Sequence, residues 1–308
     1  MTLQLNPPAR SLSLKSCFVV MLNWGVYNAT IGRIVYLKNG YWQIMRDTFL
    51  GCPIDILTMS ETVDLARDAM RTRKRLRHVA LNVAKLVTMR RDPLLAADVK
   101  SSDVVGVDGM GIVWSARFLG LPIRDRVAGI DLLNQLLEVC ANEGLKPYLL
   151  GATRDTVNAA VCQILKKHPE MRFAGVRDGY FSPEQEIDVV DEIRKSGADC
   201  LFIGMPTPRK ERFLAAHCDE INVPFIMGVG GSFDVLAGKV SRAPTRLQKL
   251  GLEWLYRVYQ EPRRMWWRYL KTNTVFAALM LQAFLHQNLH SISRLGRGEP
   301  PAKPSGSS

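Results

Sequence analysis

The sequence predicts an α/β protein with a Rossmann-like, mostly parallel sheet and helices on both faces. Short β-branched, apolar runs recur from Phe49 onward, and segments with apolar residues at helical spacing separate them. Strand, helix and strand repeated in this way form a parallel sheet, because each crossover helix packs back onto the sheet. The predicted strands are 79–82, 104–108, 146–151, 172–176, 200–204 and 224–229.

Helix boundaries agree with this pattern. Pro183 follows Ser182 and opens a predicted helix, since proline fits a first helical turn. Gly144 and Gly197 stand where two of the helices are expected to end. The predicted helices are 131–143, 154–167 and 183–196.

The composition is that of a folded protein. Of 308 residues, 47% are hydrophobic and 23% charged, which excludes collagen-like, low-complexity and fully disordered chains. The net charge of +12 favours anionic partners without choosing among phosphates, nucleic acids and acidic lipids. The cysteines form no C-x-x-C pair and the histidines have no zinc-ligand spacing, so we expect a reduced compartment and no metal.

Changes in composition divide the chain into four parts. Residues 1–48 form an N-terminal extension whose apolar run, 16–27, is too short to span a bilayer. A poorly packed extension, a membrane-touching segment and translation from an early start codon all remain open for it. Residues 49–245 form the α/β core, 246–290 a basic and aromatic helical appendage, and 291–308 a disordered tail rich in Gly, Pro and Ser.

The predicted strands end in glycine or in a polar residue. In an open parallel sheet the ligand lies beyond the carboxyl ends of the strands. Glycine there lets backbone N–H groups approach a phosphate, although a tight turn explains any single glycine equally well. Together the strand ends favour a nucleotide crevice. They are Asn82, 108–111, 151–152, 204–206 and 228–232.

Several common fingerprints of nucleotide sites are missing. The first βα unit has no G-x-G-x-x-G, and the chain has neither a P-loop nor a D-x-D motif. We therefore expect no cofactor and no metal, with cationic side chains or helix N-termini neutralising a diphosphate. A Rossmann-like enzyme that uses NAD or S-adenosylmethionine remains an alternative on fold alone, as does a non-catalytic membrane adaptor.

Asp108 is the candidate general base. It ends an apolar strand and precedes Gly-Met-Gly, which places its carboxylate at the rim of the crevice. Desolvation there would raise its pKa toward the range of a base, and an N-cap aspartate is the structural alternative. Arg126 has two equal interpretations, an ion pair with Asp131 or a contact with a substrate anion.

A series of short motifs carries a resemblance to a known family. In chain order they are FLGCPID from Phe49, then Asn82, VDGMGI, RVAGID, GYF, PRKE, GVGGSFD, RAP and GLEWLYR, which ends at Arg257. Over about residues 49–269 this order resembles the WecG/TagA/CpsF glycosyltransferases, glycosyltransferase family twenty-six. The resemblance implies inverting transfer of glucose or N-acetylmannosamine from a UDP-sugar donor to a polyprenyl-diphosphate-linked saccharide. It also implies exopolysaccharide or cell-envelope polysaccharide assembly, at the cytoplasmic face of the inner membrane.

The resemblance assigns roles to individual positions. Asp108 matches the family's proposed base, and Asn82 matches an asparagine of the substrate pocket. We expect the other matched positions to bind substrate. They are Arg126, Arg209, Lys210, Glu211, Gly230, Gly231, Phe233, Asp234, Arg257, Arg264 and Arg268.

Two positions depart from the family pattern. Ala80 stands where a threonine is usual, so that hydroxyl is lost or supplied elsewhere. The usual Pro-Lys-Gln-Glu is Pro-Arg-Lys-Glu at 208–211, which adds positive charge near the expected nucleotide. Both departures favour the gum-forming glucosyltransferase branch over the N-acetylmannosamine enzymes.

Residues 239–272 combine nine basic and two acidic residues with six Trp and Tyr residues, and the apolar run 275–281 follows. A solvated surface is the plainest explanation, and a nucleic-acid groove would also use stacked aromatics. We favour peripheral binding to an anionic membrane surface, which explains the aromatic and basic residues together. We expect no nucleic acid as partner. The resemblance also suggests that some of these arginines close over the active site, and the sequence leaves a homo-oligomer open.

Overall fold

The computed structural model describes residues 35–36 and 42–295. Contacts divide the chain into two units, residues 1–45 and 46–308. In the first unit, β1 (Val35–Tyr36) pairs antiparallel with β2 (Trp42–Gln43). The predictions made for 1–34 and for the end of the chain from 296 lie outside the described residues.

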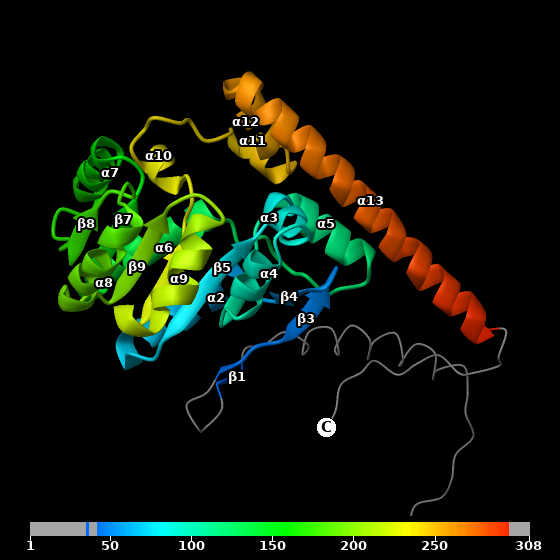
Figure 1. The fold of residues 1–308 in the computed structure, drawn as a ribbon, viewed down its shortest axis with the longest axis horizontal. Helices are drawn as coiled ribbons and strands as arrows, with labels where there is room; N and C mark the ends of the chain where they lie inside the picture. Colours follow the sequence, from blue (N-terminus) through cyan, green and yellow to red (C-terminus); the bar gives the residue numbers. More distant parts are fainter. Residues whose placement is uncertain (1–34, 37–41, 296–308) are drawn as a thin grey trace, which may run out of the picture. The chain divides into compact units, whose positions relative to one another are not determined.

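The second unit is built on a six-stranded sheet in which every neighbouring pair is parallel (Figure 1). Its strand order is β6-β5-β10-β9-β7-β8. Each predicted strand overlaps one of these, so the predicted α/β class is confirmed. The strands are β5 (Leu76–Leu81), β6 (Val104–Val107), β7 (Pro147–Gly151), β8 (Gly175–Arg177), β9 (Cys200–Gly204) and β10 (Phe225–Gly228).

Helices pack on both faces of this sheet, as the sequence predicts. On one face α2 (Met59–Thr72), α6 (Gly129–Glu143) and α7 (Arg154–Lys167) share a hydrophobic core with Phe225 and Met227 of β10. On the other face α8 (Glu186–Lys195) and α9 (Arg209–Ile221) pack with Ile226. Successive residues of β10 thus point to opposite faces, which explains why the strand is apolar throughout.

One predicted helix starts differently from expectation. Pro183–Gln185 forms a short 3-10 turn, η1, and the α-helix α8 begins at Glu186. Shorter elements complete the unit. They are β3 (Arg46–Phe49), β4 (Cys52–Asp55), α3 (Val83–Met89), α4 (Pro93–Lys100), α5 (Met110–Phe118), α10 (Ser232–Leu236), α11 (Thr245–Lys249), α12 (Glu253–Gln260) and α13 (Pro262–Leu295).

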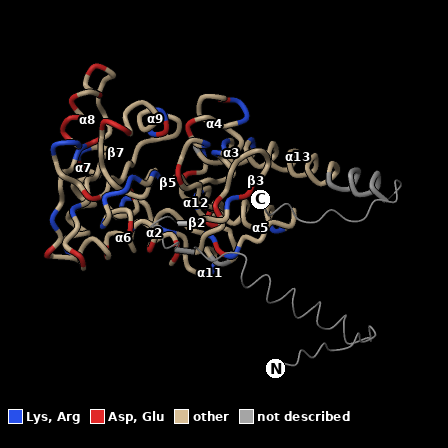
Figure 2. The backbone as a smooth tube through the Cα atoms, turned by 90° about the horizontal axis from the view of Figure 1, so that it is seen from below, with Lys and Arg blue, Asp and Glu red and all other residues tan. Residues whose placement is uncertain are grey.

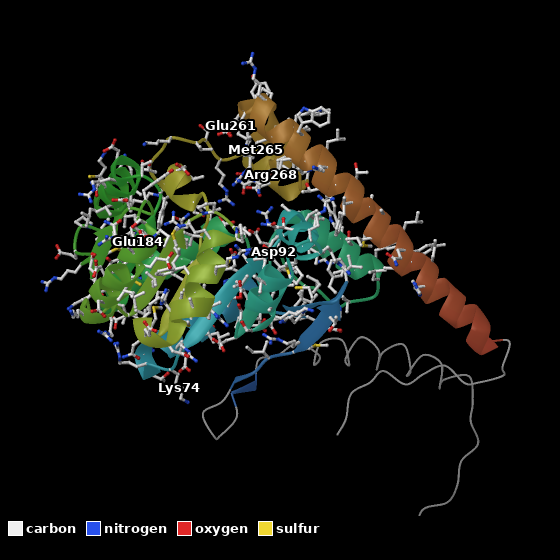
Figure 3. The ribbon with its side chains drawn as sticks, in the orientation of Figure 1. Lys74, Asp92, Glu184, Glu261, Met265 and Arg268 are labelled. Carbon is white, nitrogen blue, oxygen red and sulfur yellow. The ribbon has the colours of Figure 1, made fainter. Side chains whose placement is uncertain are left out.

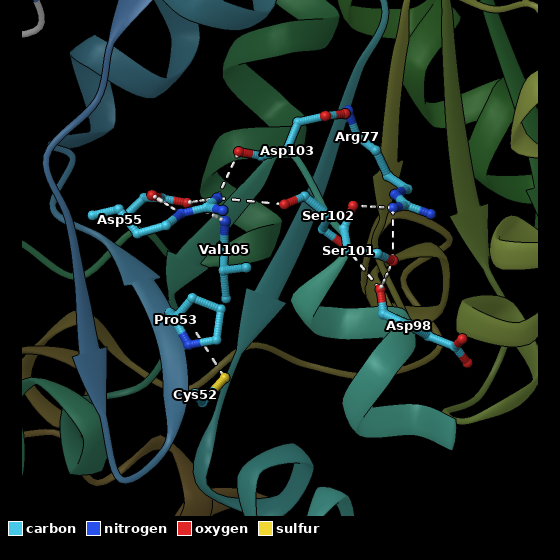
Figure 4. Close-up of polar contacts among 10 residues, drawn as sticks. Cys52, Pro53, Asp55, Arg77, Asp98, Ser101, Ser102, Asp103 and Val105 are labelled. Atoms are coloured by element: carbon cyan, nitrogen blue, oxygen red, sulfur yellow. Dashed lines mark hydrogen bonds and ion pairs between the residues drawn. The ribbon is translucent and has the colours of Figure 1, made fainter. Parts of the chain in front are cut away.

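The FLGCPID motif, the first in the family resemblance, lies in a hairpin that is attached to the edge of the sheet. β3 and β4 make a hairpin that turns at Leu50 and Gly51, both with positive φ. The buried Asp55 carboxylate at its end accepts two 2.8 Å hydrogen bonds from Arg46 and a 2.6 Å bond from the Val105 N–H (Figure 4). A buried charge that is fully partnered in this way fixes the hairpin to β6.

The predicted appendage is helical, with α12 and α13 packed together and Met265 buried. Along α13, the Phe276 ring centroid lies 6.4 Å from that of Phe49, and the Phe284 centroid 5.5 Å from that of Phe118. Residues 272–285 of α13 carry no charged side chain (Figure 2). Within the described part of the chain, no helix combines the length and hydropathy that a membrane span needs.

His78 of β5 is a buried imidazole, and neither ring nitrogen has a hydrogen-bond partner among the described residues. A Cβ at Gly106, on the neighbouring β6, would lie only 2.6 Å from His78 Nε2, so the close approach of the ring requires glycine there. Burial, with a smaller contribution from the Lys85 charge, lowers the pKa of His78 to about 4.

We expect the free energy of unfolding to decrease as pH falls from about 6.5 toward 4. The unfolded chain protonates His78 near the ordinary imidazole pKa, whereas the folded protein does not, and the loss amounts to about 3 kcal/mol. Urea unfolding at pH 7 and pH 4.5 measures it. His78→Leu should lose less stability over this interval than the parent, while the partly exposed control His168→Gln should match the parent. An equal loss in His78→Leu and the parent would contradict this assignment.

Candidate active site

The strand ends bring several predicted residues to one edge of the sheet. Asn82 follows β5 and caps α3, where its Oδ1 accepts the Lys85 N–H at 2.9 Å. Asp108 follows the adjacent β6, and its N–H donates to the Leu81 carbonyl at 2.9 Å. Beyond β10, Gly230 has a φ of 53°, a conformation that favours glycine and turns the chain into α10. These predicted residues therefore meet at the edge of the sheet where the strands end, and the crevice itself stays a prediction.

Asp108 does not cap the helix that follows it. The N-cap of α5 is Gly109, and the Asp108 carboxylate instead accepts the backbone N–H of Gly129 at the start of α6. Asp108 is partly exposed. Desolvation raises its pKa, and the Arg126 charge opposes the rise, as does, more weakly, the charge of Arg257 on α12. The raised pKa of this carboxyl group, at the end of an apolar strand, suits a general base.

Arg126 does not pair with Asp131, as one interpretation of the sequence had it. Arg126 Nη1 lies 2.7 Å from Glu253 Oε2 of α12. Asp131 accepts two bonds, of 2.5 and 2.7 Å, from Arg242. Arg242 Nε also lies 3.5 Å from Glu253 Oε1. The four side chains form a network that joins α12 of the appendage to the loop before α6.

The turn before α12 also packs against the core. Gly251 has a φ of 66°, and a Cβ there would lie 2.6 Å from the Trp114 ring and 2.7 Å from Met110 Cβ on α5. Arg257, one turn after Glu253, acts on the pKa of Asp108. The GLEWLYR motif therefore links the appendage to the candidate site, through packing on α5 and through the charge of Arg257.

A second cluster lies where α3 meets α9. Lys85 Nζ is 3.0 Å and Lys210 Nζ 2.9 Å from the same oxygen, Glu211 Oε1, which also accepts the Thr207 hydroxyl at 3.1 Å. All three charged residues are buried. Desolvation and the Lys85 charge lower the pKa of Lys210 to about 8, and Arg268 of α13 contributes in the same direction. Figure 3 places Arg268 in the first turns of α13.

Other predicted residues have structural contacts of their own. Arg209 donates to the carbonyls of Gly179 and Phe181 and stacks over the Phe181 ring at 4.6 Å from its centroid. Phe233 is fully buried, and a Cβ at Gly204 would lie 2.4 Å from its ring. Packing accounts for both positions without a ligand.

The remaining predicted positions are partly described. Asp234 Oδ2 lies 3.7 Å from the position of a Cβ on Gly231, so this carboxylate folds back on the loop after β10. The side chain of Arg264 lies outside the described residues. In the residues that the structure describes, no group of three His, Cys, Asp or Glu side chains is arranged to hold a metal ion. The expectation of no metal and no cofactor stays a prediction.

Two residues of the site were missed in the sequence. Glu253 lies within a quoted motif, but nothing in the sequence links it to Arg126. Lys85 stands outside the quoted motifs, and its ammonium group meets Glu211 only through the packing of α3 near α9.

Comparison with known proteins identifies relatives of this chain. The model of the glycosyl transferase WecG/TagA/CpsF family matches residues 48–290. An N-acetylglucosaminyldiphosphoundecaprenol N-acetyl-beta-D-mannosaminyltransferase of Bacillus spizizenii (strain ATCC 23059 / NRRL B-14472 / W23) is 32% identical over 178 residues, which cover 58% of this chain and 68% of that protein. The match to the family model makes the chain a glycosyltransferase of this fold class. The chain belongs to the WecG/TagA/CpsF family.

We expect Glu253→Gln to loosen α12, because it removes the charge shared by Arg126 and Arg242. Hydrogen exchange of the α12 backbone amides should accelerate about tenfold, as charge-assisted bonds are worth roughly 1.5–3 kcal/mol. Glu143→Gln is the matched control, since Glu143 also pairs with two arginines, Arg67 and Arg71. Unchanged exchange of α12 in Glu253→Gln, or equal acceleration in the control, would show that this network does not hold the appendage.

Proposed function

We propose that the protein transfers a hexose from a UDP-sugar to a saccharide carried on a polyprenyl diphosphate, with inversion at the anomeric carbon. Membership of the family supports sugar transfer. The name of the Bacillus relative describes a lipid-diphosphate-linked acceptor. The observation that carries the proposal is the Asp108 carboxyl group at the strand edge, whose pKa is raised by burial against the opposing charges of Arg126 and Arg257.

In the proposed mechanism Asp108 takes the proton of the acceptor hydroxyl as its oxygen attacks the anomeric carbon. The bond between that carbon and the diphosphate oxygen breaks, and its electron pair leaves with UDP. Negative charge grows on the leaving diphosphate, so cations near the strand ends lower the barrier. Arg126, Lys210, Arg257 and Arg268 are the candidates, while the Arg209 guanidinium already binds two carbonyls.

We propose glucose or N-acetylmannosamine as the donor sugar. Ala80 is partly exposed near the end of β5, in register with Gly106, and it has no hydroxyl to offer a sugar. Lys210 adds a buried cation where the family usually has glutamine. Both differences from the usual pattern favour glucose and an exopolysaccharide product.

Incubation with radiolabelled UDP-glucose or UDP-N-acetylmannosamine over bacterial lipid extract tests the activity. We expect one of the two labels to enter the organic phase. A thermal shift should accompany UDP, and none should accompany NAD or S-adenosylmethionine. Stabilisation by NAD or S-adenosylmethionine, with no labelled lipid from either sugar nucleotide, would support the alternative Rossmann-like enzyme instead. No stabilisation and no labelled lipid would favour the membrane adaptor.

We expect Asp108→Asn to lower turnover by about 10²–10⁴-fold, because asparagine cannot accept the acceptor proton. UDP affinity should stay within a few-fold of the parent, since the change leaves the cations in place. Steady-state rates with a lipid-linked acceptor and UDP titration measure the two effects separately. Turnover within a few-fold of the parent would remove Asp108 from the role of base.

We propose peripheral association with an anionic membrane, at the cytoplasmic face of the inner membrane. Trp266 and Trp267 at the start of α13 are 54% and 72% exposed, and Tyr259 of α12 is 82% exposed. Exposed tryptophans interleaved with arginines suit the lipid headgroup region. This arrangement would let the enzyme reach an acceptor anchored in the bilayer.

We expect the double change Trp266→Ser and Trp267→Ser to weaken sedimentation with anionic liposomes at least tenfold, because interfacial tryptophans contribute to binding. Deleting the chain after Gly251 should abolish it. Tyr180→Ser is the control. Tyr180 is an exposed aromatic residue outside the appendage, so this change should leave binding unchanged. Retention of binding by both the double variant and the deletion would contradict the membrane role of the appendage.

A further inference from the structure

The cluster of Lys85, Lys210 and Glu211 has an unusual charge balance. The two ammonium groups share one carboxylate oxygen, and the three residues are 7%, 6% and 3% exposed. Two buried cations against one anion leave an excess positive charge, which is costly away from water unless a further anion compensates it. The second carboxylate oxygen, Glu211 Oε2, has no hydrogen-bond partner among the described residues.

A purely structural ion pair would not need this arrangement. One lysine would neutralise Glu211, and the second raises the cost of burial. Burial, and after it the Lys85 charge, lowers the pKa of Lys210 to about 8, which reflects the cost of the second buried cation. The excess charge therefore points to a ligand that carries negative charge.

The cluster lies at the same edge of the sheet as Asp108. The Lys210 side chain crosses Gly228 at the end of β10, where a Cβ would lie 2.9 Å from Lys210 Cε. Thr207, which accepts a 2.5 Å bond from Lys210 Nζ, stands in the loop after β9. The Lys85 backbone is bound by Asn82 at the end of β5. The two lysines therefore contact the chain at the carboxyl ends of β5, β9 and β10. Asp108 follows β6, which pairs with β5.

We propose that Lys85 and Lys210 form the cation pair that binds the diphosphate of a substrate, and that Glu211 holds the two ammonium groups in place without contacting the substrate. This inference rests on the function proposed above and names the residues that receive the diphosphate. Lys85 adds a binding residue outside the motifs that carry the family resemblance. As the bond to the anomeric carbon breaks, the leaving phosphate oxygen gains negative charge, and a preorganised cation pair stabilises that charge.

The test uses variants that change the charge of the cluster in opposite directions. At pH 7, Lys85→Met and Lys210→Gln should each weaken the binding of UDP, of farnesyl diphosphate or of both at least tenfold. Glu211→Gln keeps a side-chain oxygen for the two ammonium groups and removes a negative charge beside the diphosphate, so it should weaken the same binding far less than either lysine change. Lys210→Gln introduces the residue that is usual in the family, so we expect this variant to fold. It therefore tests the proposal even if Lys85→Met does not fold. Lys100→Met, at an exposed lysine of α4, is the control.

Calorimetric titrations of the full chain with UDP, uridine and farnesyl diphosphate separate the sources of the diphosphate. A loss confined to UDP assigns the pair to the donor, and a loss confined to farnesyl diphosphate assigns it to the acceptor. Uridine binding should not respond to the lysine changes. If the parent binds UDP but the two lysine variants bind both diphosphates as tightly as the parent, or if Glu211→Gln weakens binding as they do, the inference is wrong. Failure of the parent to bind UDP would instead contradict the proposed function.

Discussion

The parallel direction of the central strands is the constraint on which the candidate site depends. Because β5, β6, β9 and β10 all run the same way, their carboxyl ends meet at one edge of the sheet. Residues far apart in the chain, from Asn82 to Gly230, are brought together there because the strands that precede them pair with one another. The buried apolar strands fix this arrangement, so polar side chains at their ends are free to serve chemistry.

Charge is distributed unevenly over that edge. Asp108 carries the carboxylate with the raised pKa at the end of β6, and Lys85 and Lys210 supply buried positive charge on the α9 face. The Glu253 network joins the appendage to the same edge through Arg126. In the proposed reaction, the carboxylate would take the proton of the acceptor hydroxyl, and the cations would bind the diphosphate of the donor. The same network links α12, and through it α13, to the candidate site.

The strands of the six-stranded sheet and three helices that flank it, α6, α7 and α8, could be predicted from the sequence, because apolar runs and helical spacing are local signals. Asp108 was predictable for the same reason, as a carboxylate at the end of an apolar strand. The partner of Arg126 was not, since Glu253 is brought to it only by the folding of α12. Phe233 lies in a motif of the family resemblance, yet it packs in the core on Gly204, so motif membership alone did not separate packing from binding.

The central claim is that the strand edge binds a uridine diphosphate next to Asp108. A crystal structure of the protein with UDP tests it most directly. The account predicts the diphosphate at the carboxyl ends of β5 and β10, with its terminal phosphate oriented so that an attached sugar would face the Asp108 carboxylate. UDP bound elsewhere, or an Asp108 carboxylate shielded from the bound nucleotide by protein, would contradict the account.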